Sequence, residues 1–230
     1  MRFTVLSSAI LLAAVNFGDS AAAALKDVDD CSKYVLLSVR GTGEKQGPSI
    51  GFKGMISTTL KTVKGGTEYD VVYPANTDRN STQIGVEDLE NYIHHGLQTC
   101  PNQKYGILGY SQGATVALTA IKDLTGTPAE DAIGAVLFIG NPFQVRGQLT
   151  TFNQTGGDST RDYNGVLLFT NPSIGLSEHW VISGKALNIC DDGDSVCTGV
   201  DQLPSRPHYL YGFTATVQKL GAEHLVSRFK

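Results

Sequence analysis

The residues best suited to chemistry lie in the segment Tyr105-Gly106-Ile107-Leu108-Gly109-Tyr110-Ser111-Gln112-Gly113. A short apolar run enters a Gly-x-Ser-x-Gly motif, and good helix formers follow it directly. This order predicts a strand, a sharp turn that carries Ser111, and a helix, which together form a nucleophile elbow. Glycine is needed two residues either side of the serine because a Cβ atom there would meet the strand and the helix. Ser111 is therefore the candidate nucleophile, and the backbone N–H of Gln112 is a candidate oxyanion donor.

A second match to the same pattern is Gly47-Pro48-Ser49-Ile50-Gly51. It follows a polar stretch, residues 44–46, and not a strand, so the sequence offers no elbow there. We interpret Ser49 as a loop residue.

A serine hydroxyl needs a base within hydrogen-bond reach, and the base needs a third group to orient it. Where the nucleophile stands on an elbow of this kind, the acid and then the histidine follow it in the chain. Four of the five histidines are set aside because they precede the candidate acids or lie on predicted helix surfaces: His94, His95, His179 and His224. His208 remains, on a loop stiffened by two prolines ahead of the closing helix, and we predict that it is the base.

The acid should lie between serine and histidine, in a loop after a strand. Residues 190–197 form a short acidic loop bounded by two cysteines, and a small disulfide ring would fix the direction of a carboxylate. The candidates are Asp191, Asp192, Asp194 and, further along, Asp201. Crowded acids are otherwise typical of a calcium loop or a solvated turn, and spacing alone does not choose among these four.

The elements that would position these groups alternate between strand and helix. We expect strands over residues 34–39, 69–74, 105–110, 132–140 and 165–169. We expect helices over residues 52–64, 84–100, the segment after Ser111, and 213–229, with a loop-rich stretch over 172–212. Such alternation over about 200 residues predicts one α/β domain with a parallel sheet.

The amino-terminal residues predict a secreted protein. Residues 1–24 have a basic Arg2, a largely apolar stretch over 3–15 and four alanines over 21–24, which is typical of a signal peptide. The mature chain, residues 25–230, is expected to be a single domain and a monomer. No later apolar run is long enough to span a membrane. The net charge of −4 without Lys/Arg clusters gives no case for a nucleic-acid partner.

Four cysteines in a secreted chain predict two disulfides. Cys190 and Cys197 flank a short loop, whereas Cys31 precedes the first strand and Cys100 ends the helix before the elbow strand. We therefore predict the pairs Cys31–Cys100 and Cys190–Cys197, and no metal site, because no Cys-x-x-Cys spacing occurs. Two sequons are glycosylation sites if the host glycosylates: Asn80-Ser81-Thr82 and Asn153-Gln154-Thr155.

At these residues the chain resembles the cutinase family, and most closely its cutinase-like, polyester-hydrolysing branch from fungi and yeasts. The matching segments follow one another along nearly the whole mature chain: Arg40-Gly41-Thr42-Gly43-Glu44, Gly47-Pro48-Ser49, Gly109-Tyr110-Ser111-Gln112-Gly113, Gly140-Asn141-Pro142, Gly193-Asp194-x-x-Cys197 and His208. The resemblance implies that Asp194 is the triad acid. It also implies that Thr42 donates its backbone N–H and hydroxyl beside Gln112, and that the two disulfides pair as above.

The fold that the resemblance implies is a small lidless α/β-hydrolase with a central five-stranded parallel sheet flanked by helices. The implied activity is that of a secreted serine esterase, without a cofactor, acting on cutin-like polyesters and on short-to-medium-chain acyl esters. Arg206, Tyr209 and Tyr211 depart from the family pattern, because a more aliphatic wall is expected beside the histidine.

Two alternatives remain open at this point. Acetylxylan esterases belong to the same wider family, but they usually have more cysteines and a tight polar pocket. Four cysteines and the Gly-Pro-Ser run favour the cutinase-like branch instead. A secreted binding or effector protein could also keep the scaffold without activity, although every triad and oxyanion position here holds a competent residue type.

Overall fold

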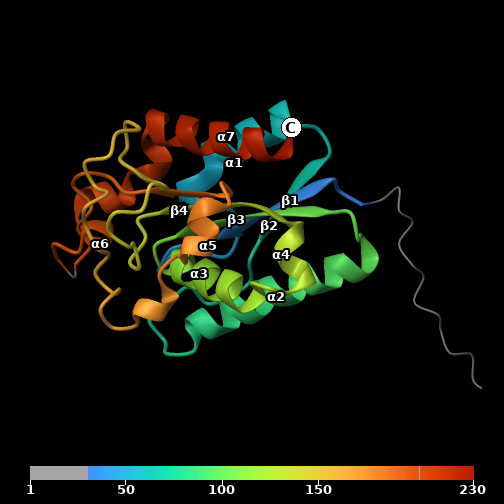
Figure 1. Ribbon diagram of the computed structural model, residues 1–230, viewed down its shortest axis with the longest axis horizontal. Helices are drawn as coiled ribbons and strands as arrows, with labels where there is room; N and C mark the ends of the chain where they lie inside the picture. Colours follow the sequence, from blue (N-terminus) through green and yellow to red (C-terminus); the bar gives the residue numbers. More distant parts are fainter. Residues whose placement is uncertain (1–30, 202) are drawn as a thin grey trace, which may run out of the picture.

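The computed structural model describes residues 31–230 except residue 202, so the signal peptide predicted for residues 1–24 lies outside the described residues. A twisted parallel sheet lies between two layers of helices (Figure 1). The strands are β1 (Tyr34–Val39), β2 (Gly66–Asp70), β3 (Lys104–Tyr110), β4 (Ile133–Ile139), β5 (Thr151–Phe152) and β6 (Ala186–Ile189). The helices are α1 (Lys53–Thr62), α2 (Ser81–Thr99), α3 (Gln112–Leu124), α4 (Pro128–Ala132), α5 (Glu178–Ile182), α6 (Ser195–Thr198) and α7 (Ala215–Phe229).

Helices α1 and α7 cover one face of the sheet, and α2, α3 and α4 cover the other (Figure 1). The side chains of strand β1 alternate between the two hydrophobic cores, one on each face of the sheet. Val35, Leu37 and Val39 pack into the core beneath α2 and α3, whereas Tyr34 and Leu36 pack beneath α1 and α7. Because both faces are buried, the strand is apolar except for the buried Ser38, as central parallel strands mostly are.

The order of the strands places the functional loops at one edge. The sheet runs β2-β1-β3-β4-β6-β5, and every pair is parallel. The chain moves from β1 outward to β2 and then returns to the other side at β3, so the strand order reverses between β1 and β3. Val39 pairs with Gly109 at the carboxyl ends of these two strands. In open α/β sheets this reversal creates a crevice where ligands bind.

The prediction of an α/β-hydrolase with a parallel sheet is confirmed, but the sheet has six strands and not five. The strand predicted over residues 165–169 is wrong: this segment forms turns, and Phe169 is 73% exposed. The missing strand is β6, together with the two-residue β5. The polar Asn188 interrupts the apolar pattern of β6, yet its side chain is buried and donates to Gln144 Oε1 at 2.8 Å and Thr151 Oγ1 at 3.1 Å.

Both predicted disulfides are present. Cys31–Cys100 ties the segment before β1 to the end of α2, and Cys190–Cys197 closes the loop after β6. Within residues 31–230, leaving out 202, no helix combines the length and the apolarity that crossing a bilayer requires.

The edge strand β2 carries two half-buried carboxyl groups on one face, Glu68 and Asp70. Burial, and then the negative charge of Asp70, raise the pKa of Glu68 from 4.5 to about 7. The folded state therefore binds a proton here more tightly than the unfolded chain does. This contribution to stability is complete below pH 4.5 and is lost as the pH rises through about 7.

We predict that Glu68→Gln raises Tm at pH 8 and changes it little near pH 4. The gain at pH 8 is roughly 1–2 kcal/mol, or a few degrees, once the raised pKa is discounted for partial exposure. Thermal unfolding followed by circular dichroism from pH 4 to pH 8 measures this difference. Glu87→Gln on α2 removes an exposed carboxylate and is the matched control. A Tm difference for Glu68→Gln that stays constant with pH would contradict the prediction.

Candidate active site

Ser111 lies on a sharp turn between β3 and α3, as the motif predicts. Its φ of 54° and ψ of −116° are strained for a residue with a Cβ atom. The flanking glycines make the turn sterically allowed. A Cβ on Gly113 would lie 2.1 Å from the carbonyl oxygen of Val39, and one on Gly109 would lie 2.6 Å from that of Gly113. Any other residue at either position would therefore displace the elbow from the sheet.

His208 and Asp194 come together with Ser111 at this edge. His208 Nε2 lies 2.9 Å from Ser111 Oγ, and His208 Nδ1 lies 2.8 Å from Asp194 Oδ2. Both are buried, with exposed fractions of 2% for His208 and 0% for Asp194. Because an ionised carboxylate only accepts hydrogen bonds, Nδ1 carries the proton and Nε2 is free to accept one from the serine. This geometry can transfer a proton from Ser111 to the imidazole.

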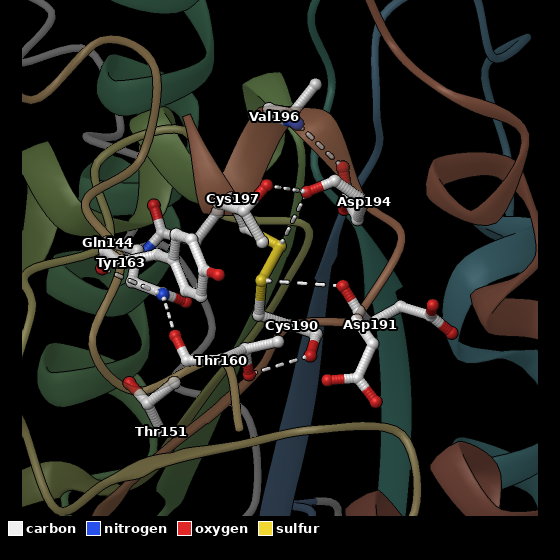
Figure 2. The surroundings of a disulfide bond; sticks show 12 residues. Gln144, Thr151, Thr160, Tyr163, Cys190, Asp191, Asp194, Val196 and Cys197 are labelled. Carbon is white, nitrogen blue, oxygen red and sulfur yellow. Dashed lines mark hydrogen bonds between the residues drawn. A yellow bond between two sulfur atoms is a disulfide. The ribbon is translucent and has the colours of Figure 1, made fainter. Parts of the chain in front are cut away.

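The short disulfide loop gives Asp194 its direction (Figure 2). Asp194 stands at the N-cap of α6, where its Oδ1 accepts from the backbone N–H of Val196 at 2.8 Å. The 3₁₀ segment Arg206–Tyr209 presents His208 opposite, after the two prolines noted in the sequence.

The other three candidate acids have different partners. Asp191 accepts from the N–H of Gly193 at 3.1 Å, and Asp201 accepts from the N–H of Leu203 at 3.1 Å. Asp192 accepts from Gln154 Nε2 at 3.1 Å. These bonds hold loops in shape, and they leave Asp194 as the carboxylate that contacts His208.

The remaining histidines lie outside this group. His94 and His95 are exposed on α2, and His179 pairs with Glu130. His224 differs from the expectation of a surface residue: it is half-buried, and its Nε2 lies 3.1 Å from the carbonyl oxygen of Lys185. Burial lowers the pKa of His224 to about 4, which fits a neutral packing residue.

The two residues predicted as oxyanion donors belong to different segments at this edge of the sheet. Gln112 is the first residue of α3, and its backbone N–H belongs to the free donors of a helix N-terminus. Thr42 lies in the loop after β1, is exposed, and lines the same cavity as Ser111.

Two charged residues to which the sequence assigns no role hold the loop of Thr42 in place. The Glu44 carboxylate accepts from the N–H groups of Gly41 at 2.6 Å and Ile50 at 2.8 Å, and from Ser49 Oγ at 2.9 Å. Arg40, which is 1% exposed, donates to the carbonyl oxygens of Glu44 and Tyr73. Ser49 is thus a buried loop residue whose hydroxyl group donates a hydrogen bond to the Glu44 carboxylate. Preorganisation of this kind is what an oxyanion donor requires.

A cavity of about 810 Å³ opens beside Ser111. Most of the cavity surface is apolar and comes from residues such as Ile50, Tyr110, Tyr209 and Phe213, although Glu44, Lys45 and Gln46 also line it. Ile50 and Phe213 are 55% and 74% exposed, which extends this apolar surface to the outside of the molecule.

The two sequons differ in accessibility. Asn80 is exposed just before α2. Asn153 is 7% exposed, and its Nδ2, the atom that a glycan would occupy, donates to Ser159 Oγ at 2.7 Å. Of these two asparagines, Asn80 is therefore the one whose side chain is accessible to a glycan.

Comparison with known proteins gives a consistent result. The model of the Cutinase family matches residues 30–228. A cutinase-like protein from Cryptococcus sp. is 35% identical, with a TM-score of 0.81, covering 86% of this chain and 96% of that one. Carboxylesterase Culp1 from Mycobacterium tuberculosis is 28% identical over 86% of this chain and 83% of its own length. The catalytic core of acetyl xylan esterase from Trichoderma reesei, at 18% identity and a TM-score of 0.64, covers 86% of this chain and 100% of its own, and shows the fold alone.

Proposed function

This chain belongs to the cutinase family and is a carboxylic ester hydrolase, and we propose that it is a secreted serine esterase with Ser111, His208 and Asp194 as its triad. The observation that carries the proposal is the continuous chain of hydrogen bonds from Ser111 Oγ through the imidazole to Asp194, at 2.9 Å and 2.8 Å. This series of hydrogen bonds begins at Ser111, beside the cavity, and ends on the buried carboxylate of Asp194.

In the proposed mechanism Ser111 Oγ attacks the ester carbonyl carbon while His208 Nε2 takes the hydroxyl proton. The tetrahedral oxyanion accepts hydrogen bonds from the backbone N–H groups of Gln112 and Thr42. His208 then gives its proton to the leaving alcohol as the C–O bond breaks, which leaves an acyl group on Ser111. Water, deprotonated by His208, hydrolyses this acyl-enzyme and restores the serine. Asp194 holds the imidazole in the required tautomer throughout.

We propose cutin-like polyesters and short-to-medium-chain acyl esters as the substrates. The apolar lining of the cavity suits an acyl chain better than a sugar-borne acetate. Ser111 is itself partly exposed, and the apolar rim of Ile50 and Phe213 would let a bulky or polymeric ester approach.

A turnover series separates this proposal from its rivals. We expect kcat/KM on p-nitrophenyl esters to peak between butyrate and octanoate, with weaker turnover of acetate and palmitate, release of acids from an aliphatic polyester film, and no acetate from acetylated xylan. A sharp acetate preference with acetyl release from xylan would instead make the protein an acetylxylan esterase. Failure to turn over any ester, together with no labelling by a serine-directed phosphonate, would favour an inactive binding protein.

We also propose that residues 1–24 are a signal peptide and that residues 25–230 are one extracellular domain that acts as a monomer. Two disulfides support an oxidising compartment. Amino-terminal sequencing of the protein from culture medium, with light scattering for its mass, tests these points.

A further inference from the structure

The hydroxyl group of Tyr211 lies inside the proposed active site without belonging to the triad. Tyr211 follows His208 by three residues, and its side chain is buried, with 2% exposed. Three polar atoms surround the hydroxyl oxygen: Asp194 Oδ2 at 2.6 Å, the backbone nitrogen of Asp191 at 3.0 Å and Cys197 Sγ at 3.5 Å.

The direction of these hydrogen bonds follows from counting protons. The backbone N–H of Asp191 can only donate, so the tyrosine oxygen accepts there. The single hydroxyl proton of Tyr211 then has a choice between a carboxylate oxygen and a disulfide sulfur, and sulfur is a weak acceptor. The proton therefore goes to Asp194. Burial, and then the nearby Asp194 charge, raise the pKa of Tyr211 far above its ordinary value, so this donor stays protonated throughout the working pH range.

Asp194 Oδ2 therefore accepts two donors at once. His208 Nδ1 lies 2.8 Å away and Tyr211 Oη 2.6 Å away, while the other oxygen, Oδ1, is held by the N–H of Val196. Two donors on one oxygen share its negative charge. The charge that remains for the imidazolium is smaller than it would be with His208 alone, so the protonated imidazole is stabilised less.

We propose that Tyr211 is a positioning residue that holds Asp194 toward His208 and, by sharing the charge on Oδ2, weakens the stabilisation that Asp194 gives to the imidazolium. This inference rests on the proposed triad. The titratable groups that face His208 are Asp194 of the disulfide loop, Tyr110 of β3, and Tyr209 and Tyr211, which follow it in the chain. The charges of Asp191 and Glu44 act on Tyr211 and Tyr110, and Arg206, two residues before His208, is exposed. Of these, Tyr211 is the neutral donor that contacts the carboxylate.

The test is Tyr211→Phe, which keeps the ring and removes the hydroxyl. The acid limb of the kcat/KM–pH profile on p-nitrophenyl butyrate is expected to move up by about 0.5 to 1 pH unit, because Oδ2 then stabilises the imidazolium more strongly. At the pH optimum kcat is expected to fall roughly 3- to 30-fold through looser placement of Asp194. A profile that scales down without moving its acid limb would overturn the proposal.

Tyr34→Phe is the matched control. Tyr34 is 1% exposed, and its hydroxyl donates to the carbonyl oxygen of Val63 at 2.7 Å, at the opposite end of β1 from the site. This variant also loses one buried tyrosine hydrogen bond, so its Tm should fall while its acid limb stays in place. An equal shift of the acid limb in Tyr34→Phe would show that the effect reports stability and would overturn the inference.

Two further measurements keep the inference testable if Tyr211→Phe folds poorly. Replacing Tyr211 with 3-fluorotyrosine makes the hydroxyl a stronger donor, so the acid limb should move to lower pH, opposite to Tyr211→Phe. Titration of His208 by proton and nitrogen NMR, without substrate, should show the same two opposite shifts. An unchanged titration would overturn the role of Tyr211. Retained turnover in a Ser111→Ala variant would instead overturn the proposed triad, so the two failures are distinguishable.

Discussion

Replacing Ser111 with alanine is expected to lower kcat for ester hydrolysis by roughly 10⁴- to 10⁶-fold while the protein stays folded. The loss is large because no acyl-enzyme can form, and only binding and the oxyanion donors would remain to assist water. The fold should persist because the elbow is closed by backbone bonds that alanine keeps: Ser111 N donates to the carbonyl of Ile139, and Ala114 N donates to that of Ser111. Turnover of p-nitrophenyl butyrate and a thermal melt measure both quantities.

Ser49→Ala is the matched control, because Ser49 stands in the chain's other Gly-x-Ser-x-Gly match. Its hydroxyl donates to Glu44 and accepts from the N–H of Gly51, so its loss should loosen the loop that carries Thr42. We expect less than about a tenfold fall in kcat, the cost of one or two neutral hydrogen bonds, with phosphonate labelling retained. Ser111→Ala at more than one per cent of the wild-type rate, or no labelling in Ser49→Ala alone, would contradict the assignment of the nucleophile.

The parts of the site that depend on local sequence could be predicted. The elbow is a short-range device: a strand, a strained serine and two glycines follow one another, and each glycine is demanded by a contact below 3 Å. The position of His208 after the candidate acids, on a loop stiffened by two prolines, predicts it as the base. The structure brings Ser111 and His208 together as that order requires.

The parts that depend on distant contacts could not be predicted from the residues alone. Asp191, Asp192 and Asp194 are equivalent in spacing, and only the fold decides which of them contacts His208. The sequence assigns no role to Arg40 and Glu44, yet their hydrogen bonds hold the loop after β1 in place.

Strand β6 was missed for a related reason. Its Asn188 breaks the apolar pattern that marks a buried strand, and the side chain is acceptable there because Gln144 and Thr151 accept both of its N–H protons. Residues 165–169 show the opposite error. An apolar run predicts a strand, but residues 166–170 form turns, and Gly165 lies so close to the carbonyl oxygen of Pro142 that a Cβ would come within 2.4 Å.

Asp194→Asn is expected to lower kcat at neutral pH by about 10⁴-fold. Asp194 accepts three hydrogen bonds, from Val196 N–H, Tyr211 Oη and His208 Nδ1. An asparagine has one carbonyl oxygen, so its amide group must face at least one of these donors. If the amide faces His208, the imidazole shifts its proton to Nε2 and can no longer accept the proton of Ser111. Burial of the site prevents water from replacing the missing acceptor.

Asp192→Asn makes the same chemical change two residues away, within the same disulfide loop. Asp192 accepts from Gln154 and Ser159 and does not contact the imidazole, so less than about a threefold change in kcat is expected, in the range of a surface substitution. A loss in Asp192→Asn as large as that in Asp194→Asn would mean that the loop, and not the carboxylate, controls the rate. If Asp194→Asn kept kcat within tenfold of wild type, Asp194 would have no place in the triad. Asp194→Asn and Asp192→Asn together therefore test whether the contact between Asp194 and His208 is required for catalysis.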